Sequence, residues 1–568
     1  MRLTRALLVC SALFWLACES HLQPENHVQS GAVSTAHPLA TEVGIDILRK
    51  GGNAFDAAVA AHYALAVVYP VAGNIGGGGF AVFSTEQGEM RALDFRETAP
   101  AAAHRNAFLD SSGILMEGAS LLGHRAVGVP GSVAGMELLH NEYGVLPFKE
   151  VIQPAIDLAR EGFLLTPFGA DRLNRAHDDI ALANNHHPWL VRDTSWREGE
   201  RIYFSDLATV LERIRELGQA DFYEGETANL MVREMQNGGG WMTHEDLKNY
   251  RPVWREPVSF RYRNHDVYSM PPPSSGGIAL AQLLMGGLHF PWDSLGPHSA
   301  MSIHLKSELA RRVYADRATH LGDPDFYPVP VDMLLDSLYL NERMRSINPE
   351  RATPSSDIKE GEVMRIESFE TTHLSVIDNR GNAVAITTTL NSYFGSKVVV
   401  EGGGFFLNNE MDDFSIQPGV PNQFGLVGGD ANAIEPGKRM LSSMSPTIVT
   451  KNGKVRWVLG TPGGSTIITN VYQVLQNLID HGMDLQSAVN APKMHAQWLP
   501  DEIILERRLA DSALIRELEK TGHQVRIIQQ IGRFNAVGVK PNGKFEAAAD
   551  TSRTGDATGV VFRSEHGY

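Results

Sequence analysis

The first part of the chain carries its apolar residues at helical spacing. Residues 39–50, LATEVGIDILRK, repeat apolar side chains every three or four positions, and two glycines follow as a stop signal. A second helix is predicted from Asp56 through AAVAAHYALAVV, and Pro70 ends it. Residues 132–235 have the pattern of several helices joined by polar loops. The segment YSMPPPSSGGIAL predicts a rigid turn that leads into a helix near Gly277.

The later part of the chain is richer in strand-like runs. Residues 348–370, with proline, serine and alternating charge, predict a solvated, mobile connector. Beyond it, DNRGN predicts a hairpin turn, and VRWVLGTPGGSTIITNVYQVLQNLI predicts a strand, a glycine turn and a helix. Because helices and strands occur in separate runs, we expect layered α/β packing, with helices covering stacked sheets. Short β-type runs occupy residues 373–378, 383–389, 397–400 and 447–450.

The composition is that of a folded, acidic protein. The 568 residues, 43% of them hydrophobic, can bury a large core, and this length alone suggests two or more domains. The formal net charge is −16. A strongly acidic body disfavours nucleic acid and anionic membranes as main partners.

Residues 1–18, MRLTRALLVCSALFWLAC, have the features of an export signal. Two arginines precede an apolar run from Ala6 to Cys18 that is too short to span a bilayer comfortably. We therefore expect an exported protein of the bacterial periplasm or cell envelope. Cys18 resembles the lipidated cysteine of a lipoprotein signal, which would anchor the chain to the membrane, although Trp15 departs from that pattern. An ordinary secretory signal is the alternative. Both cysteines, Cys10 and Cys18, lie in this segment, so the mature body cannot contain a disulfide.

Several common catalytic and metal-binding motifs are missing. The sequence has no G-x-S-x-G elbow and no H-E-x-x-H motif, and thiolate zinc sites are excluded because the body lacks cysteine. The glycines at 76–79 are not followed by the Lys-Ser/Thr pair of a phosphate loop, and NNEMDDFS lacks the spacing of a calcium loop. His186 and His187, in ANNHHPW, are more typical of a polar loop. No metal site is predicted.

A threonine at a chain terminus offers another route to hydrolysis. Thr371 lies in FETTHLSVID, where the polar connector meets a predicted strand. An internal threonine hydroxyl has no base beside it, whereas a terminal threonine has its own α-amine, with an ordinary pKa of about 7.7–8.0. Thr371 gains that amine only if the bond from Glu370 is cut. The alternative is that β-branched residues simply begin a strand here.

The segments that surround Thr371 resemble one known family. TTHLSVIDNRGNAVAITTTLNSYFG, LNNEMDDFS, GLVGGDANAIEPGKRMLSSMSPTIV and GTPGGS follow in order, and ATEVGIDILRKGGNAFDAAVA, AGNIGGGGF, ALDFRETAP and MPPPSSGGI precede them. Together they resemble the γ-glutamyltransferase (glutathione hydrolase) family of N-terminal-nucleophile hydrolases. The resemblance runs from about residue 31 to the C-terminus.

The resemblance implies a fold and a maturation step. The fold would be a four-layer αββα sandwich. The precursor would cut itself between Glu370 and Thr371, giving a large chain of residues 19–370 and a small chain of residues 371–568. The two chains would remain associated as a heterodimer, because neither alone supplies both Arg96 and Thr371.

The resemblance also assigns residues to the head group of a γ-glutamyl substrate, which carries a carboxylate and an ammonium. Arg96 matches the family's carboxylate-binding arginine, a role that suits the planar guanidinium. Ser442 and Ser443 match serines that also hold the carboxylate. Taken alone, Arg96 would be a surface or structural ion pair and the serines would form turns. The positions that match the ammonium-binding residues are Asn391, Glu410 and Asp413.

Three further positions match residues close to the reaction. Thr389 matches a threonine that supports the nucleophile, and its alternative is an ordinary strand-surface residue. Gly463 and Gly464 would form the oxyanion hole through consecutive backbone N–H groups, although the pair also suits a simple strand-to-helix turn. Asp412, beside the acids of the head-group site, is expected to be a solvated or structural carboxylate.

The implied activity is transfer of the γ-glutamyl group of glutathione or a similar compound. The group passes to Thr371 and then to water or to the amine of an amino acid or dipeptide, with no cofactor. Two alternatives remain open. One is a glutaryl-type amidase acting on β-lactam side chains, which the ammonium-binding set disfavours. The other is a non-catalytic, lipid-anchored envelope protein of the same fold.

Phe424 lies in a segment that resembles the lid loop of bacterial members of the family. It stands where bacterial members usually have a lid tyrosine, so it keeps a ring over the substrate but lacks the hydroxyl that can bond across the pocket. We expect a looser gate, and replacing Phe424→Tyr should shift the ratio of hydrolysis to transfer. The ratio is measured with a γ-glutamyl anilide, with and without a dipeptide acceptor. An unchanged ratio would remove the support for this role.

Overall fold

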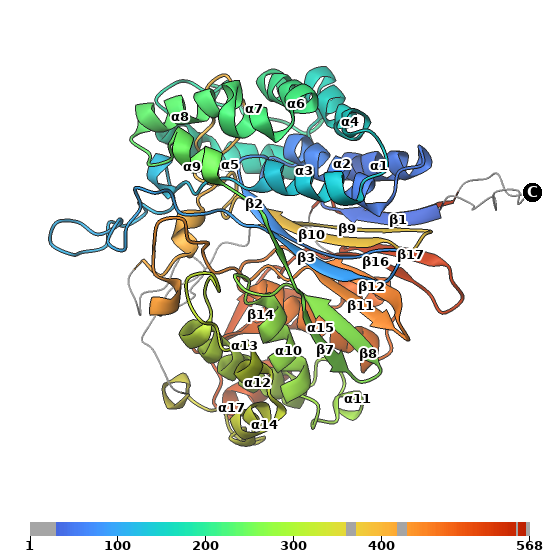
Figure 1. Cartoon of the computed structure of the whole chain (residues 1–568). Coiled ribbons are helices and arrows are strands. Elements are labelled where there is room, and N and C mark those ends of the chain that lie inside the picture. The colour runs from blue at the N-terminus through green and yellow to red at the C-terminus, as the bar shows by residue number, and fades with distance from the viewer. Residues whose placement is uncertain (1–29, 359–370, 417–428, 553–554, 564–568) are drawn as a thin grey trace, which may run out of the picture.

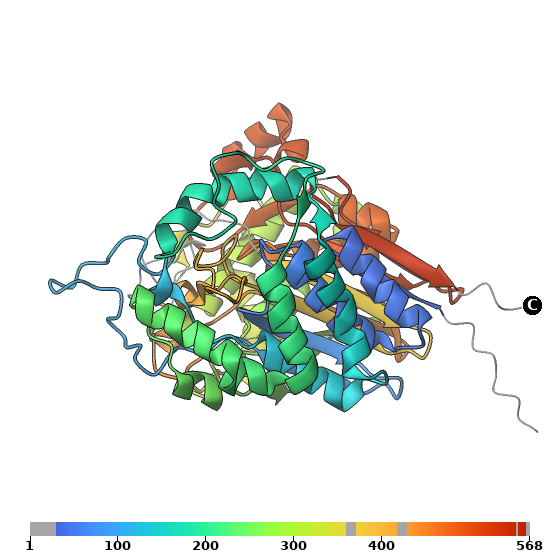
Figure 2. The ribbon, with the colours of Figure 1, turned by 90° about the horizontal axis from the view of Figure 1, so that it is seen from above.

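The protein consists of stacked layers of helices and sheets. The structure is a computed structural model that describes residues 30–358, 371–416, 429–552 and 555–563. Two β-sheets lie in the middle of the molecule and helices cover both outer faces (Figure 1). Seen from above in Figure 2, the blue, teal and green helices of the N-terminal half lie over the stack. This is the four-layer αββα arrangement that the family resemblance implies.

The first sheet has seven strands, drawn from both ends of the described chain. Inside it lies β9 (Thr372–Asp378), which pairs antiparallel with β1 (Ser30–Thr35) on one side and with the central strand β10 (Ala383–Thr389) on the other. The strand order is β18-β1-β9-β10-β2-β3-β6. The remaining strands are β2 (Gly78–Ser84), β3 (Met90–Phe95), β6 (Val253–Arg255) and β18 (Thr558–Arg563).

The second sheet has six strands in the order β17-β16-β12-β11-β8-β7 and stacks against the first. Strands from before and after position 370 share both sheets, so the two predicted chains interleave. The strands are β7 (Val258–Tyr262), β8 (His265–Ser269), β11 (Thr447–Lys451), β12 (Lys454–Gly460), β16 (Asn535–Val539) and β17 (Phe545–Ala549). Smaller sheets contain β4 (Phe163–Leu164), β5 (Arg201–Ile202), β13 (Met494–Ala496), β14 (Ile503–Glu506) and β15 (Val525–Ile528).

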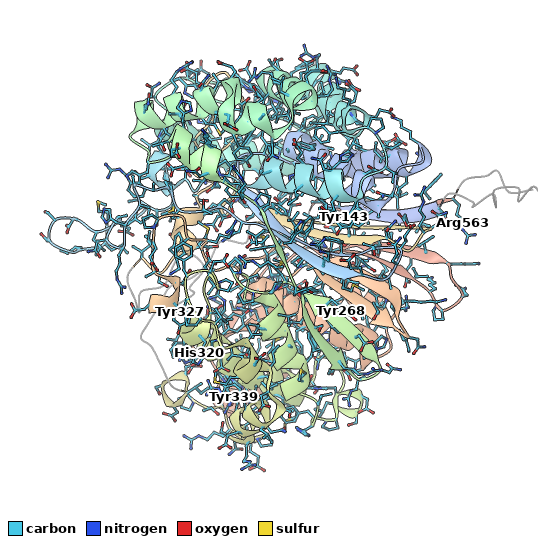
Figure 3. The ribbon with its side chains drawn as sticks, in the orientation of Figure 1. Tyr143, Tyr268, His320, Tyr327, Tyr339 and Arg563 are labelled. Atoms are coloured by element: carbon cyan, nitrogen blue, oxygen red, sulfur yellow. The ribbon has the colours of Figure 1, made fainter. Side chains whose placement is uncertain are left out.

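Helices before β6 cover the seven-stranded sheet, and later helices cover the six-stranded sheet (Figure 1). In Figure 3, Tyr143 lies with the first group and Tyr339 with the second. The first group is α1 (Pro38–Arg49), α2 (Ala54–Val68), α3 (Ser132–Tyr143), α4 (Phe148–Glu161), α5 (Pro167–Ala183), α6 (Ser205–Leu217), α7 (Gln219–Glu224), α8 (Glu226–Gly238) and α9 (His244–Asn249). The second is α10 (Gly276–Gly286), α11 (Trp292–Leu295), α12 (Ala300–His320), α13 (Val331–Leu335), α14 (Ser337–Arg345), α15 (Thr466–Ile479), α16 (Leu485–Asn490) and α17 (Ser512–Lys520).

Most of the predicted elements are present. The two N-terminal helices are α1 and α2, and Asn53 caps α2 by a reciprocal capping box with Asp56. The hairpin turn DNRGN joins β9 to β10, and the predicted strand–turn–helix is β12 and α15. Among the described residues, no helix is both long enough and apolar enough to cross a membrane.

The strand predicted at residues 397–400 is wrong. Lys397, the first residue of this segment, has a φ of 66°, outside the extended region of regular strands. The chain turns back on itself here, and Val399 makes only an isolated bridge to Phe406. The β-branched composition of the segment therefore reflects burial rather than sheet pairing.

Alternation along β9 and β10 sends successive side chains to different layers. Leu374 and Val376 belong to the apolar core under α2, whereas Ile377 belongs to the core between the two sheets. His373 also points between the sheets, because a Cβ added to Gly460 of β12 would lie 2.4 Å from its ring. By the same alternation, Thr371 faces the six-stranded sheet.

Asp378 ties the end of β9 to the first layer of helices. Its carboxylate accepts hydrogen bonds from the backbone N–H groups of Arg380, Gly381 and Asn382 at 2.8–3.0 Å. It also accepts one from the N–H of Ala54, the first residue of α2, at 2.9 Å. One buried carboxylate thus fixes both the hairpin turn and the start of a core helix.

Replacing Asp378→Ala should lower the free energy of unfolding by about 2–5 kcal/mol, because it leaves several buried N–H groups without an acceptor. Chemical denaturation measures this loss. The control is Arg380→Ala, which removes an exposed side chain from the same turn and should cost less than about 0.5 kcal/mol. Equal losses in the two variants would show that Asp378 has no such role.

Candidate active site

One pocket brings together most of the residues that the sequence singles out. It contains about 300 Å³ of empty space. Three of its lining residues, Arg317, Met444 and Ile467, were not predicted. The predicted residues that line it are Arg96, Thr371, Thr389, Asn391, Glu410, Asp413, Ser442, Ser443 and Gly464.

Two threonines on neighbouring strands form one wall of the pocket. Thr371 directly precedes β9 and is only 6% exposed, and Thr389 ends β10. The register pairs Thr388 with Thr372, so one further step places Thr389 opposite Thr371, with both on the same face of the sheet. The Thr389 hydroxyl accepts a hydrogen bond from the N–H of Asn391 at 2.7 Å, which fixes its position.

Arg96, which follows β3, lies fully buried among acidic side chains. Its Nη1 lies 2.7 Å from Glu410 and its Nη2 2.5 Å from Asp413. Its Nε donates to the carbonyl of Met440 at 3.3 Å. The family resemblance assigns Arg96 to the carboxylate of the head group and the two acids to its ammonium, and in the structure these three side chains form one ion-pair cluster.

A third carboxyl, that of Glu97, completes this cluster at 3.5 Å from Arg96 Nη1. Burial raises the pKa of Glu97 to about 7, although Arg96 acts in the opposite direction. Burial likewise raises the pKa values of Glu410 and Asp413, again opposed by Arg96. For Arg96, burial acts to lower the pKa, but the surrounding carboxylates outweigh it and raise the pKa above its usual value.

Arg317 is a pocket residue that sequence reasoning missed. It lies on α12 and is 4% exposed. Its Nε donates to the Ser275 hydroxyl at 2.9 Å and its Nη2 to the Ser443 hydroxyl at 3.3 Å. Its positive charge also acts to lower the pKa of Asp413. Nearly all of α12 is buried, so no polar stripe in the sequence distinguishes this arginine from its charged neighbours.

The MPPPSSGGI segment holds the serines of the pocket in place. Ser442 and Ser274 form a bridge, and the carbonyl of Ser442 accepts hydrogen bonds from both the N–H and the hydroxyl of Ser275. The Ser442 hydroxyl accepts a bond from the N–H of Met444 at 3.1 Å. The predicted rigid turn therefore positions two hydroxyl-bearing residues at the pocket.

The glycine pair lies between β12 and α15 in a backbone conformation that favours glycine. Gly463 and Gly464 have φ angles of 142° and 52°, and a Cβ on Gly463 would lie 2.4 Å from the Thr466 hydroxyl oxygen. Gly464 lines the pocket, whereas Gly463 is absent from its lining. Gly463 closes the turn, because its carbonyl accepts bonds from the N–H and the hydroxyl of Thr466.

The structure separates Asp412 from the other acids. Its carboxylate accepts a hydrogen bond from the Ser120 hydroxyl at 2.6 Å, and it does not line the pocket. The structural role predicted for Asp412 agrees with this arrangement.

Three further residues that the sequence singles out lie outside the described residues: Cys18, Glu370 and Phe424.

The chain is similar to known proteins along most of its length. The γ-glutamyltranspeptidase family model matches residues 40–560. The chain is 46% identical to a glutathione hydrolase proenzyme of Escherichia coli over 536 residues, which is 93% of this chain and 92% of the relative.

Two solved structures are also similar. A cephalosporin acylase from Bacillus halodurans superimposes with a TM-score of 0.81 at 28% identity, covering 94% of this chain and 96% of that one. A chain of Helicobacter pylori γ-glutamyltranspeptidase, 42% identical, covers 59% of this chain and 96% of its own length, with a TM-score of 0.56. The extent of the family match and the identity to a full-length relative establish that this chain belongs to the γ-glutamyltranspeptidase family of N-terminal-nucleophile hydrolases.

Proposed function

We propose that the protein is a self-processing γ-glutamyltransferase and glutathione hydrolase. The observation that carries the proposal is the pocket in which Thr371, at the start of a central strand, faces a buried cluster of one arginine and several carboxyls. The similarity to a glutathione hydrolase proenzyme supports both the activity and the processing.

Maturation supplies the catalytic base. The Thr371 hydroxyl attacks the carbonyl of Glu370, and an ester replaces the peptide bond, which frees the Thr371 α-amine. Water then hydrolyses the ester, giving the Glu370 carboxylate and the free Thr371 hydroxyl. Residues 19–370 become the large chain and residues 371–568 the small chain. A Helicobacter pylori chain that covers only 59% of this sequence, yet is itself 96% covered, supports such a division.

Catalysis then uses Thr371 a second time. Its α-amine, with an ordinary pKa of about 7.7–8.0, accepts the hydroxyl proton while the oxygen attacks the γ-glutamyl carbonyl. The same amine returns the proton to the departing nitrogen. The resulting ester is resolved by water or by the amine of an acceptor. Backbone N–H groups of the Gly463–Gly464 turn are proposed to stabilise the oxyanion.

Charge selects the head group. Arg96, with Ser442 and Ser443, is proposed to bind the α-carboxylate, and Asn391, Glu410 and Asp413 to bind the α-ammonium. Because several carboxyls share the buried guanidinium of Arg96, the cluster has room for another positive charge, which the substrate ammonium brings.

Two alternatives are weaker. The similarity to a cephalosporin acylase supports, as one alternative, an amidase that removes a different acyl group. A glutaryl substrate has no ammonium, however, and would leave the carboxyl cluster without its counter-charge. A non-catalytic envelope protein would have no use for Thr371, Arg96 and Gly464 in a single pocket.

We also propose that residues 1–18 direct export of the protein, with or without lipidation of Cys18.

Replacing Thr371→Ala should abolish both processing and turnover, because it removes the only proposed nucleophile. The purified wild type should run as two bands on a denaturing gel, and the variant as one. Hydrolysis of a γ-glutamyl anilide should fall by more than about a thousandfold. The control is Thr372→Ser, one position along the same strand, which should still be processed. An active wild type that is a single polypeptide across residues 370 and 371 would exclude this mechanism.

Glu97 predicts a pH dependence of stability. Its pKa is raised to about 7 in the folded protein from an ordinary value of 4.5. A carboxyl with a raised pKa contributes its stability fully below pH 4.5 and loses it as the pH rises towards 7. The neutral variant Glu97→Gln should not lose this contribution. Its melting temperature, relative to wild type, should therefore rise between pH 5 and pH 7.5.

The measurement is thermal unfolding at half-unit pH steps, on the processed protein. Glu350→Gln, at an exposed position, is the control and should follow the wild-type profile. Parallel profiles for wild type and Glu97→Gln would mean that Glu97 stays ionised throughout this range.

A further inference from the structure

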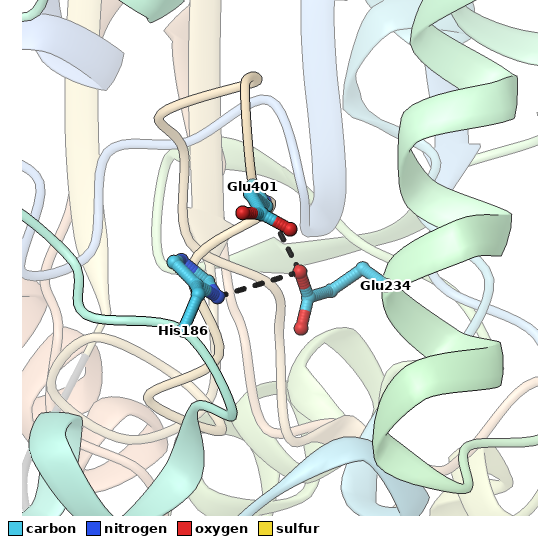
Figure 4. Close-up of side chains that lie close together, drawn as sticks. All are labelled: His186, Glu234 and Glu401. Atoms are coloured by element: carbon cyan, nitrogen blue, oxygen red, sulfur yellow. Dashed lines mark hydrogen bonds and ion pairs between the residues drawn. The ribbon is translucent and has the colours of Figure 1, made fainter.

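A second group of polar side chains converges outside the active-site pocket. His186 lies in the loop after α5, Glu234 on α8, and Glu401 in a turn of the chain after β10 (Figure 4). One ligand-capable atom from each residue lies within 4.8 Å of the others. None of the three lines the pocket that contains Thr371.

Glu234 is the fixed centre of the group. Its side chain is 2% exposed, and its Oε2 accepts a hydrogen bond from the backbone N–H of Glu401 at 3.1 Å. The same oxygen lies 3.8 Å from His186 Nδ1, which is beyond hydrogen-bond distance. The hydrogen bond from the Glu401 backbone N–H therefore holds this turn against the Glu234 carboxylate, while the His186 imidazole lies 3.8 Å from the same oxygen.

A fourth residue orients Glu234. Its other oxygen, Oε1, lies 2.8 Å from Nε2 of His124, a side chain that is 5% exposed. The ring of His124 packs against the end of α8, where a Cβ added to Gly238 would lie 2.0 Å from Nδ1. A glycine is thus needed there for the ring to fit. Carboxylates that bind metals are themselves hydrogen-bonded by outer groups, and His124 would fill that role for Glu234.

We propose that His186, Glu234 and Glu401 bind a zinc ion. One imidazole and two carboxylates form a ligand set that zinc accepts, and their two negative charges balance those of Zn²⁺. Calcium and magnesium prefer oxygen ligands throughout, so the imidazole disfavours them. Glu401 is exposed and His186 half-buried, so a water molecule can complete a tetrahedron.

The three ligand atoms need to move only slightly closer together to bind a zinc ion. Ligand atoms about 2.1 Å from a tetrahedral zinc ion lie roughly 3.4 Å from one another. The distance of 3.8 Å between His186 Nδ1 and Glu234 Oε2 is already close to this value. The exposed side chain of Glu401 can rotate to supply the remaining movement.

The site lies between segments of the two predicted chains. His186 and Glu234 precede position 370, whereas Glu401 follows it. If the chain is cut before Thr371, as the proposed function requires, zinc would join the large and small chains. Zinc binding itself does not depend on that cut, so the two proposals can fail separately.

The test uses tag-free, processed protein that has been stripped of metal with a chelator. Titration with Zn²⁺ is followed by calorimetry, and titration with Co²⁺ by visible absorption, which reports the coordination geometry. His186→Gln and Glu401→Gln each remove one ligand. The matched control is His187→Gln, because His187 is the exposed neighbour of His186 in the same loop.

We expect one Zn²⁺ per molecule and a higher melting temperature in its presence. His186→Gln and Glu401→Gln should each weaken binding at least tenfold and lose the thermal shift, whereas His187→Gln should match the wild type. The proposal is overturned if no saturable binding occurs, or if His187→Gln weakens binding as much as the ligand variants do. It is also overturned if the ligand variants bind as tightly as the wild type, since the group would then be only a polar clamp between the two chains.

Discussion

The pairing of β9 with a neighbour on each side is the constraint on which the active site depends. The strand forms a ladder with β1 and another with β10, so its register is fixed from both directions. A shift of one residue would turn the Thr371 hydroxyl towards the core under α2. Chain termini ordinarily fray, so a terminus that serves as nucleophile needs such an anchor. A strand inside the sheet provides it, and the proposed cut would free an amine without freeing the strand.

The position of Arg96 within the same sheet explains why its charge is buried. Arg96 follows an inner strand of the sheet and cannot retreat to solvent, so its positive charge must be balanced inside the protein. The surrounding carboxyls more than balance it, and part of the excess is relieved by protonation, as the raised pKa of Glu97 indicates. Arg317 reaches the pocket from the opposite layer through Ser443. The site is therefore assembled from the seven-stranded sheet, from loops, and from helices of the layer that covers the six-stranded sheet. Its charge suits the zwitterionic head group of the proposed substrate.

Local sequence patterns predict several helices and a hairpin of this structure. The contacts that they do not predict join residues far apart in the chain. The helices α1, α2 and α15 and the hairpin of β9 and β10 follow from spacing, caps and turn residues close in the sequence. The resemblance to a known family assigned most of the pocket residues to one site. The ion pairs of Arg96 with Glu410 and Asp413 join positions more than 300 apart, so no local pattern contains them. Arg317 was hidden because α12 is buried on every side.

Interleaving of the two predicted chains makes their association a consequence of the fold. β9 and β10 lie between strands of the large chain in one sheet, while β7 and β8 extend the other sheet, which is otherwise built from the small chain. Separating the chains would expose unpaired strand edges and both apolar cores, a cost far above that of an ordinary interface. A zinc ion is therefore not needed to hold the chains together. It would act locally, fixing the turn at Glu401 against α8, in the same stretch of chain that leads on to Glu410 and Asp413.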